Sequence, residues 1–227
     1  MNMKKGILVP LLSGGVDSAI ATLKEKKASG VERLEPIFID REQKGVDQER
    51  KAACTVSNIL KATDFYSYHI DFSWYKREKA KESKTIPHGR NLVLAAIAAS
   101  HAATTHPSCR NIVIVGFNSE DAGMGDTTQD FVKALNQVIS HAIGFNEDNS
   151  IVIVKAPLIR MKKSEAISWA LKNGGEEMLK HTWSCWADPE DNNGLHCGLC
   201  DACVKRHFAF QQAMKSDPTK YQHKLKE

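Results

Sequence analysis

The sequence has no apolar run that approaches the roughly 20 residues a helix needs to cross a bilayer. Its first apolar segment, residues 6–12, is short and interrupted by Pro10, and no small-residue cleavage site follows it. A secretory signal peptide requires both of the missing features. We therefore expect a cytoplasmic protein without a membrane partner.

An excess of charge of one sign is also missing. The 227 residues carry 31 basic and 27 acidic side chains, for a net charge of +4, and contain no long basic run. Nucleic-acid binding depends on clustered Lys and Arg, so this balance argues against a nucleic-acid partner. The length and the apolar fraction of 42% predict one globular domain, with room for a small appendage.

Buried strand-like segments alternate with helix-like segments through most of the chain. Strands are expected at 6–12, 34–40, 66–71, 111–117 and 150–158, and helices at 16–27, 46–61, 91–103, 131–143 and 163–175, the last with Ser164 as N-cap. This alternation predicts a doubly wound α/β fold whose mostly parallel sheet has right-handed crossovers. A ligand is then expected at the carboxyl ends of the strands.

The turn after the first strand, residues 13–18, reads Ser-Gly-Gly-Val-Asp-Ser. It lacks the spacing and the Lys of a Walker loop, and the third Gly of a dinucleotide fingerprint. Glycines permit close backbone approach and free N–H groups gather at a helix start, so the turn predicts an anion cradle. A helix cap without a ligand is the alternative. The turn resembles the pyrophosphate loop of the N-type ATP pyrophosphatases, which cleave ATP between its α and β phosphates.

This resemblance implies ATP and Mg²⁺ as ligands. The implied ATP-binding residues are Ser13, Gly14, Gly15, Asp17 and Ser18, with Asp40 at the end of the second strand. The glycines would offer N–H groups and the serines hydroxyls, while Asp17 would hold Mg²⁺ or orient the loop.

Lys163 opens a helix directly after the strand that ends in Ala-Pro-Leu. A lysine beside a helix N-terminus is locally unfavourable, and an anion there would explain it. An ordinary surface lysine is the alternative. Related enzymes place a phosphate-binding Lys in this context, so the resemblance implies that role for Lys163.

Four of the six cysteines stand near the end of the chain with the spacing C-x11-C-x2-C-x2-C: Cys185, Cys197, Cys200 and Cys203. Four thiolates at such spacing suit tetrahedral Zn²⁺, and metal binding would fold a tail that has no other core. An iron–sulfur cluster is the alternative. His181, His196 and His207 flank the cysteines as substitute ligands. We expect residues 1–180 to form a nucleotide-binding domain and residues 181–227 a helical zinc-binding tail packed on it.

Three further stretches complete a larger pattern: "IPHGRN" at 86–91, "GFNSED" with "DTTQDF" between 116 and 131, and "PLIRMKKSE" at 157–165. Together with the turn and the cysteines, they resemble the 7-cyano-7-deazaguanine synthases of queuosine biosynthesis over nearly the whole chain. This implies an adenine nucleotide alpha hydrolase-like, Rossmann-like fold and a homodimer. It also implies a carbon–nitrogen ligase that forms AMP and pyrophosphate. Such a ligase adenylates the carboxylate of 7-carboxy-7-deazaguanine, and ammonia converts the adenylate to the amide. A second ATP then activates the amide for dehydration to the nitrile.

By the same resemblance, Asp17, Lys163 and Arg90 are the implied catalytic residues. Arg90, Asn91, Asp126 and Phe131 are the implied substrate-binding residues, with Asp126 reading the purine-like edge.

Two departures from the family pattern bear on the reaction. One residue is inserted in Pro87-His88-Gly89-Arg90-Asn91, where the family reads Pro-Gly-Arg-Asn. Thr127 and Thr128 stand where the family has Cys-Arg, so a positive charge is missing near an anionic substrate.

Three other readings therefore stay open beside the standard synthase. A defence-associated variant would couple an activated deazaguanine to another amine, such as that of a protein. A tRNA-modifying sulfur-transfer enzyme would also adenylate its substrate, but it requires a catalytic Cys. A nucleotide-binding module without catalysis would interact through its metal-binding tail.

Overall fold

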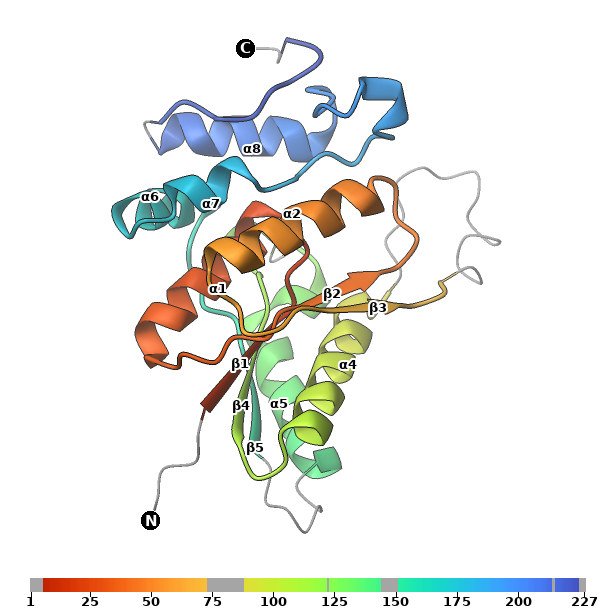
Figure 1. The fold of residues 1–227 in the computed structure, drawn as a ribbon, viewed down its shortest axis with the longest axis vertical. Helices are drawn as coiled ribbons and strands as arrows, with labels where there is room; N and C mark the ends of the chain where they lie inside the picture. The colour runs from red at the N-terminus through yellow and green to blue at the C-terminus, as the bar shows by residue number, and fades with distance from the viewer. Residues whose placement is uncertain (1–5, 73–87, 122, 144–150, 214, 225–227) are drawn as a thin grey trace.

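The computed structural model describes residues 6–72, 88–121, 123–143, 151–213 and 215–224 (Figure 1). Strands β1 (Gly6–Pro10), β4 (Arg110–Ile114) and β5 (Ile151–Lys155) pair in parallel. Strands β2 (Ile37–Asp40) and β3 (Tyr66–His69) form a second parallel pair. Two parallel bridges, Leu8 with Leu34 and Leu11 with Ile37, join β1 to β2.

The strands therefore run in the order β3-β2-β1-β4-β5. From β1 the chain first builds outward to β2 and β3, and then returns to add β4 and β5 on the other side. The switch between the two directions lies between β1 and β4, which is where a doubly wound sheet opens a crevice at its carboxyl edge. The expected doubly wound, parallel α/β fold is confirmed.

Helices cover both faces of the sheet because strand side chains alternate between them. Leu8, Phe38 and Ile112 belong to one core, which they form with α1 (Val16–Ser29), α2 (Val46–Ile59) and α6 (Lys163–Lys172). Val9 and Val113 belong to the other, with α4 (Arg90–Thr105) and α5 (Gln129–Ile143).

The C-terminal part is helical and packs on the first of these cores. It contains α7 (Glu176–Lys180), the short 3-10 helix η3 (Glu190–Asn192) and α8 (Asp201–Gln212), which lies beside α6 (Figure 1). Arg206 of α8 is 1% exposed and donates to the hydroxyl of Thr182 at 2.8 Å and the carbonyl of Leu179 at 3.2 Å. Its Nε lies 3.3 Å from Asp217. Arg206 therefore ties α8 to the segment that precedes the cysteines.

Several boundaries differ from the sequence prediction. The strand expected at 150–158 ends at Lys155 because Pro157 has no N–H to donate, and residue 150 lies outside the described residues. The helix expected at 163–175 ends at Lys172, and Gly174 at φ +80° separates it from α7.

The N-cap expected at Ser164 is wrong, because Lys162 occupies that position. The Lys162 N–H donates to Glu165 at 2.8 Å, so the N-cap lies two residues before the expected one, while the helix begins at Lys163 as expected. Within the described parts of the chain, no helix combines the length and the apolarity that crossing a membrane requires.

Candidate functional site

The turn at residues 13–18 lies at the carboxyl end of β1, where Gly15 is the N-cap of α1. Gly15 has no capping side chain, so the first N–H groups of α1 lack intrahelical partners. Gly14 has φ +80°, and a Cβ there would lie 2.4 Å from the carbonyl oxygen of Glu49, so only glycine fits. The Ser13 and Ser18 hydroxyls lie 3.1 Å apart. The turn thus presents N–H and hydroxyl groups at the positive end of a helix dipole, which suits an anion.

Gly116 holds the opposite side of this turn. It follows β4, and a Cβ on it would lie 2.7 Å from the backbone nitrogen of Ser18. The start of α1 therefore packs directly on the loop after β4, across the switch point between the two strands. Sequence reasoning assigned no role to Gly116, although a glycine within a predicted buried strand, here 111–117, is a signal for close backbone approach.

Asp17, at the start of α1, and Lys163, at the start of α6, meet at this edge. Lys163 Nζ lies 2.9 Å from Asp17 Oδ2. Burial would lower the pKa of Lys163, but the charges of Asp17, Asp121 and Glu120 raise it above its ordinary value. Asp17 Oδ1 is buried and has no hydrogen-bond partner in the described part of the chain. Such an oxygen can ligate a hard cation.

Two further acidic residues, Glu120 and Asp121, complete this cluster. Both lie in the GFNSED stretch, and the sequence predicted no role for either. Glu120 accepts the backbone N–H of Lys163 at 3.1 Å. Asp121, in the 3-10 helix η1 (Ser119–Asp121), has a pKa raised by burial and by the negative charge of Asp17. A neighbouring cation would relieve that repulsion.

A second group of side chains lies at the start of α4. The Asn91 backbone N–H donates to Asp126 Oδ2 at 3.1 Å, and its side-chain amide donates to the Asp126 carbonyl at 3.3 Å. Burial and the charge of Arg41 lower the pKa of Arg90. The negative charges of Asp126 and Glu49 raise it by less, so the pKa stays below its ordinary value. Arg90 Nε is buried, with no hydrogen-bond partner among the described residues.

The two groups are electrostatically connected. Asp121 acts on the pKa of Arg90 and is itself influenced by Asp17 and Lys163. The structure therefore brings Asp17, Lys163, Arg90 and Asp126 to one charged region at the carboxyl edge of the sheet. Ile86 and Pro87, the first two residues of the predicted Arg-Asn loop motif, lie outside the described residues.

Asp40 and Phe131 have other partners within the chain. Asp40 ends β2, and its two carboxylate oxygens contact Arg50 at 2.6 Å and the Glu42 N–H at 2.9 Å. Phe131 is half-buried in the core against Phe117, with ring centroids 6.3 Å apart. Their predicted roles in binding ATP and substrate stay predictions.

Thr127 and Thr128 hold their own backbone in place. Thr127 is 3% exposed, and its hydroxyl donates to the carbonyls of Asp121 at 2.6 Å and Met124 at 2.7 Å. The Thr128 hydroxyl accepts the N–H of Phe131 at 3.1 Å, which caps α5. Both hydroxyls are therefore used in local structure.

The four tail cysteines converge on one point. The sulfur atoms of Cys185, Cys197, Cys200 and Cys203 all lie within 4.8 Å of one another. Hydrogen bonds among the thiols raise the pKa of Cys185 to about 11, raise that of Cys203 and lower that of Cys200. The donor set fits a thiophilic metal ion.

The flanking histidines have other partners. His196 Nε2 accepts the Ser184 N–H at 3.0 Å, and burial lowers the pKa of His196 to about 4, so it is neutral and already bonded. His181 contacts Glu177 at 3.1 Å, and His207 contacts Gln211 at 2.9 Å. Among the described residues, the metal-ligand group contains the four cysteines and none of these histidines.

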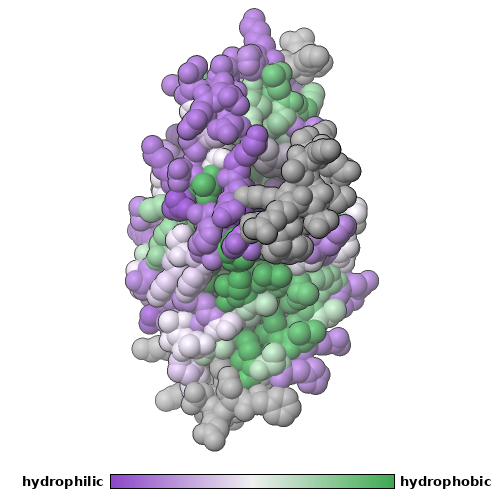
Figure 2. Space-filling model, turned by 90° about the vertical axis from the view of Figure 1, so that its right-hand side faces the viewer, coloured by the Kyte–Doolittle hydropathy of each residue, from purple (hydrophilic) through white to green (hydrophobic). Residues whose placement is uncertain are grey.

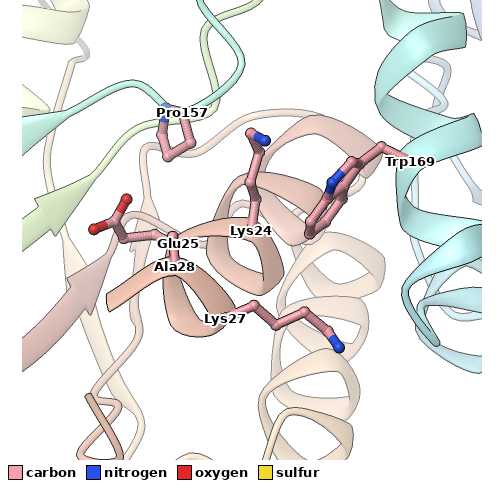
Figure 3. Close-up of a pocket in the computed structure, with 6 residues that line it drawn as sticks. All are labelled: Lys24, Glu25, Lys27, Ala28, Pro157 and Trp169. Atoms are coloured by element: carbon pink, nitrogen blue, oxygen red, sulfur yellow. The ribbon is translucent and has the colours of Figure 1, made fainter. Parts of the chain in front are cut away.

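A hollow of about 340 Å³ lies elsewhere, along the C-terminal half of α1 (Figure 3), lined by Lys24, Glu25, Lys27, Ala28, Pro157 and Trp169. Lys24 Nζ lies 4.7 Å from the centre of the Trp169 ring, and Glu25 pairs with Lys155 at 2.6 Å. Because Lys24 and Glu25 already have partners, the hollow carries less candidate chemistry than the strand ends.

Comparison with known proteins finds 7-cyano-7-deazaguanine synthases similar to this chain over nearly its whole length. The chain is 29% identical to the 7-cyano-7-deazaguanine synthase of Methanothrix thermoacetophila, covering 96% of this chain and 100% of that one. It is 28% identical to the synthase of Campylobacter fetus, with 97% and 99% covered. It is also similar to the solved structure of a U34-tRNA thiolase, NcsA from Methanococcus maripaludis with its [4Fe-4S] cluster. That likeness has 16% identity, a TM-score of 0.48, and coverage of 83% of this chain and 61% of that one, from which no function is drawn.

The family model described as "Queuosine biosynthesis protein QueC" matches residues 7–214, which include the turn, the charged region and the cysteine cluster. The chain therefore belongs to the QueC family.

Proposed function

We propose that this chain is an ATP-dependent carbon–nitrogen ligase that forms AMP and pyrophosphate. Its substrate is 7-carboxy-7-deazaguanine, whose carboxylate it adenylates and converts with ammonia to the amide. A second ATP then adenylates the amide oxygen, which leaves with AMP as the nitrile forms. The observation that carries the proposal is the uncapped start of α1 beside the Asp17–Lys163 pair, at the switch point of the sheet. The relatives named 7-cyano-7-deazaguanine synthase support the choice of substrate.

In the adenylation step, a carboxylate oxygen attacks the α phosphorus of ATP. The bond between this phosphorus and the oxygen that bridges it to the β phosphate breaks. The leaving pyrophosphate takes the electron pair and gains negative charge. Free N–H groups of the 13–18 turn and the ammonium group of Lys163 stabilise that charge. The raised pKa of Lys163 keeps the ammonium charged at neutral pH.

Mg²⁺ fits the acidic side of the site. Asp17, with its buried unpartnered oxygen, and Asp121, with its raised pKa, would hold the ion. Bound there, Mg²⁺ would neutralise phosphate charge.

The group at the start of α4 is suited to the deazapurine. Arg90 Nε is a buried donor that would bind the substrate carboxylate or the α phosphate. Asp126, fixed by Asn91, has remaining acceptor capacity for the N–H groups of a guanine-like edge.

Zn²⁺ is the proposed metal of the cysteine cluster. Four Zn–S bonds of about 2.3 Å in a tetrahedron place sulfurs about 3.8 Å apart, and Cys197 and Cys203 Sγ lie 3.9 Å apart. A four-iron cluster has to fit its irons and sulfides between the thiolates, which spreads the cysteine sulfurs further. We also propose the division into a nucleotide-binding part, 1–180, and a zinc-binding part, 181–227. A homodimer through the exposed apolar side of α4 completes the proposal.

The test is mass spectrometry of the products formed from ATP, Mg²⁺, 7-carboxy-7-deazaguanine and ammonia. The expected products are AMP, pyrophosphate, the amide and the nitrile. If only the deazaguanine adenylate accumulates, ammonia is not the acceptor. ADP and orthophosphate as products, or no turnover, would contradict the proposal.

A second candidate is the variant that couples the activated deazaguanine to another amine, such as that of a protein. It is favoured by the loss of the family Arg at position 128, where the Thr128 hydroxyl caps a helix. Accumulating adenylate that disappears only when a protein acceptor is added would support it.

Sulfur transfer to tRNA is less well supported. It requires a catalytic Cys, and four thiols converge on the metal cluster. Of the other two, Cys109 lies just before β4, at the amino edge of the sheet opposite the candidate site, and Cys54 is exposed in the middle of α2.

A further inference from the structure

Trp183 lies between the cysteine cluster and the 13–18 turn and contacts both. Its backbone N–H donates to the carbonyl oxygen of Gly14 at 2.9 Å. Its indole Nε1 donates to the carbonyl oxygen of Cys185, a cluster cysteine, at 3.0 Å. Trp183 thus forms hydrogen bonds to both the 13–18 turn and the cysteine cluster.

On the cluster side, the Trp183 ring packs against His196, with ring centroids 4.2 Å apart. His196 in turn accepts the N–H of Ser184 at 3.0 Å. The Cys197 N–H donates to the sulfur of Cys185 at 3.2 Å. Segment 183–185 is therefore fixed by the same residues that shape the cluster.

On the turn side, Gly14 is the point where the backbone adopts a positive φ and passes close to α2. The bond from Trp183 orients the peptide carbonyl of Gly14, and the same peptide unit carries the N–H of Gly15. The indole also reaches the loop before α2, because a Cβ on Gly45 would lie 3.5 Å from Trp183 Nε1. Trp183 thus borders two loops at the carboxyl edge of the sheet.

We propose that Trp183 is a positioning residue through which the metal-loaded cysteine cluster holds the 13–18 turn in its phosphate-binding conformation. The inference rests on the proposed function for the identity of the ligand, ATP. Because binding effects are reciprocal, a nucleotide on the turn should also slow the loss of metal from the cluster.

The test compares Trp183→Phe with Trp169→Phe at full metal occupancy. Phenylalanine keeps an aromatic ring at position 183 and removes the indole N–H that bonds to Cys185. Trp169 lies on α6 against Lys24, so its variant controls for the loss of an indole elsewhere. Hydrogen exchange is followed in peptides that cover the turn and, as an internal reference for global unfolding, in peptides that cover β4.

Trp183→Phe should raise exchange in the turn about fivefold, the effect of one lost hydrogen bond, and leave β4 unchanged. It should weaken the binding of α,β-methylene-ATP, which cannot be cleaved between its α and β phosphates, by a similar factor. The nucleotide should slow zinc release from the wild type and not from Trp183→Phe. Trp169→Phe should behave as the wild type in all three measurements.

Unchanged exchange in the turn of a metal-loaded Trp183→Phe protein would overturn the inference. So would equal slowing of zinc release in this variant and in the wild type. If the turn responds as expected but α,β-methylene-ATP does not bind the wild type, the coupling stands and the proposed function fails. The two failures are therefore distinguishable.

Discussion

Asp17 has two carboxylate oxygens in different surroundings. Oδ2 pairs with Lys163 at 2.9 Å, while Oδ1 is buried without a partner among the described residues. The paired oxygen orients the lysine, and the other remains available to a cation. The turn motif alone identifies Asp17, but its pairing with Lys163 follows from the fold, which brings the starts of α1 and α6 together.

Asp17→Asn keeps the size of the side chain and removes its charge. We expect pyrophosphate release to fall about 100-fold or more, the usual effect of losing one electrostatic group at a reacting phosphate or carbonyl. The fold should be retained, as judged by circular dichroism. The matched control is Asp130→Asn, an exposed carboxylate that pairs with Lys133. Equal losses in both variants would remove Asp17 from the catalytic residues.

At the scale of the element, the departure from the family sequence at Thr128 affects the start of α5 in two ways. Thr128 lacks the charge of the family Arg, yet its hydroxyl caps the helix and its neighbour Thr127 fixes the preceding loop. A substitution at position 128 therefore changes a helix cap and the charge near the site together.

Thr128→Arg should lower the free energy of unfolding by about 1 kcal/mol, because it removes the cap. If the missing charge limits the reaction, the same variant should raise the yield of nitrile per ATP consumed. Thr128→Ala is the control, since it removes the cap without adding charge. Product analysis that shows no gain over Thr128→Ala would mean that the missing Arg is neutral for the reaction.

The metal-binding tail is a second element whose stability depends on few groups. Cys200→Ser removes one of four thiolates, and we expect most of the zinc and much of the soluble yield to be lost, because metal binding and folding of such a tail are coupled. Elemental analysis of the wild type should find about one zinc per chain. Cys54→Ser, outside the cluster, should keep its zinc. Iron in place of zinc would favour the iron–sulfur alternative.

At the scale of the whole molecule, the surface is unevenly polar. Figure 2 shows an apolar area over the face that carries α4, where Leu92 is 43% exposed and Val93 is 39% exposed. Apolar side chains gathered on one face are typical of an interface, and a homodimer would cover them.

Leu92→Glu should shift the protein towards monomer by placing a charge in that face. Light scattering coupled to gel filtration measures the change. Phe208→Glu on α8, an equally exposed apolar residue, serves as the control. A wild type that is monomeric at all concentrations would refute the dimer.

A buried carboxylate, Glu35, makes the free energy of unfolding depend on pH. Glu35 is fully buried between Arg33 and His106, with His106 Nε2 at 2.6 Å. Burial would raise the pKa of Glu35, but the hydrogen bonds from His106 and Arg33 outweigh it and leave the pKa below its ordinary value of 4.5. A lowered pKa means that the carboxylate stabilises the fold above about pH 4.5, and that this contribution is lost as the pH falls through the folded-state value.

Glu35→Gln should cost about 3 kcal/mol of unfolding free energy at pH 7, because one partner of a buried ion pair is removed. The difference from wild type should shrink as the pH falls below about 4.5. Urea unfolding at pH 7 and pH 4 measures both values, with exposed Glu32→Gln as the control. A difference that does not change with pH would show that Glu35 is not ionised in the folded protein.

The amino-acid sequence by itself determined the local features. The order of strands and helices, the 13–18 turn and the spacing of the cysteines can all be read from neighbouring residues, because propensity, capping and ligand spacing act over a few positions. The exact ends of elements were less predictable, as at Ser164, because the carboxylate of Glu165 accepts the N–H of Lys162 and makes Lys162 the N-cap of α6.

Only the tertiary structure decided which of these features meet. Gly116 packs against Ser18, and Trp183 lies between the 13–18 turn and Cys185. The charge of Asp121 interacts with Asp17 and Lys163 and also with Arg90. Each of these interactions connects residues far apart in the chain. No local preference encodes such contacts. They arise because parallel strands place their carboxyl ends at one edge of the sheet, and because α8 packs on α6 and brings the cysteine cluster to that edge.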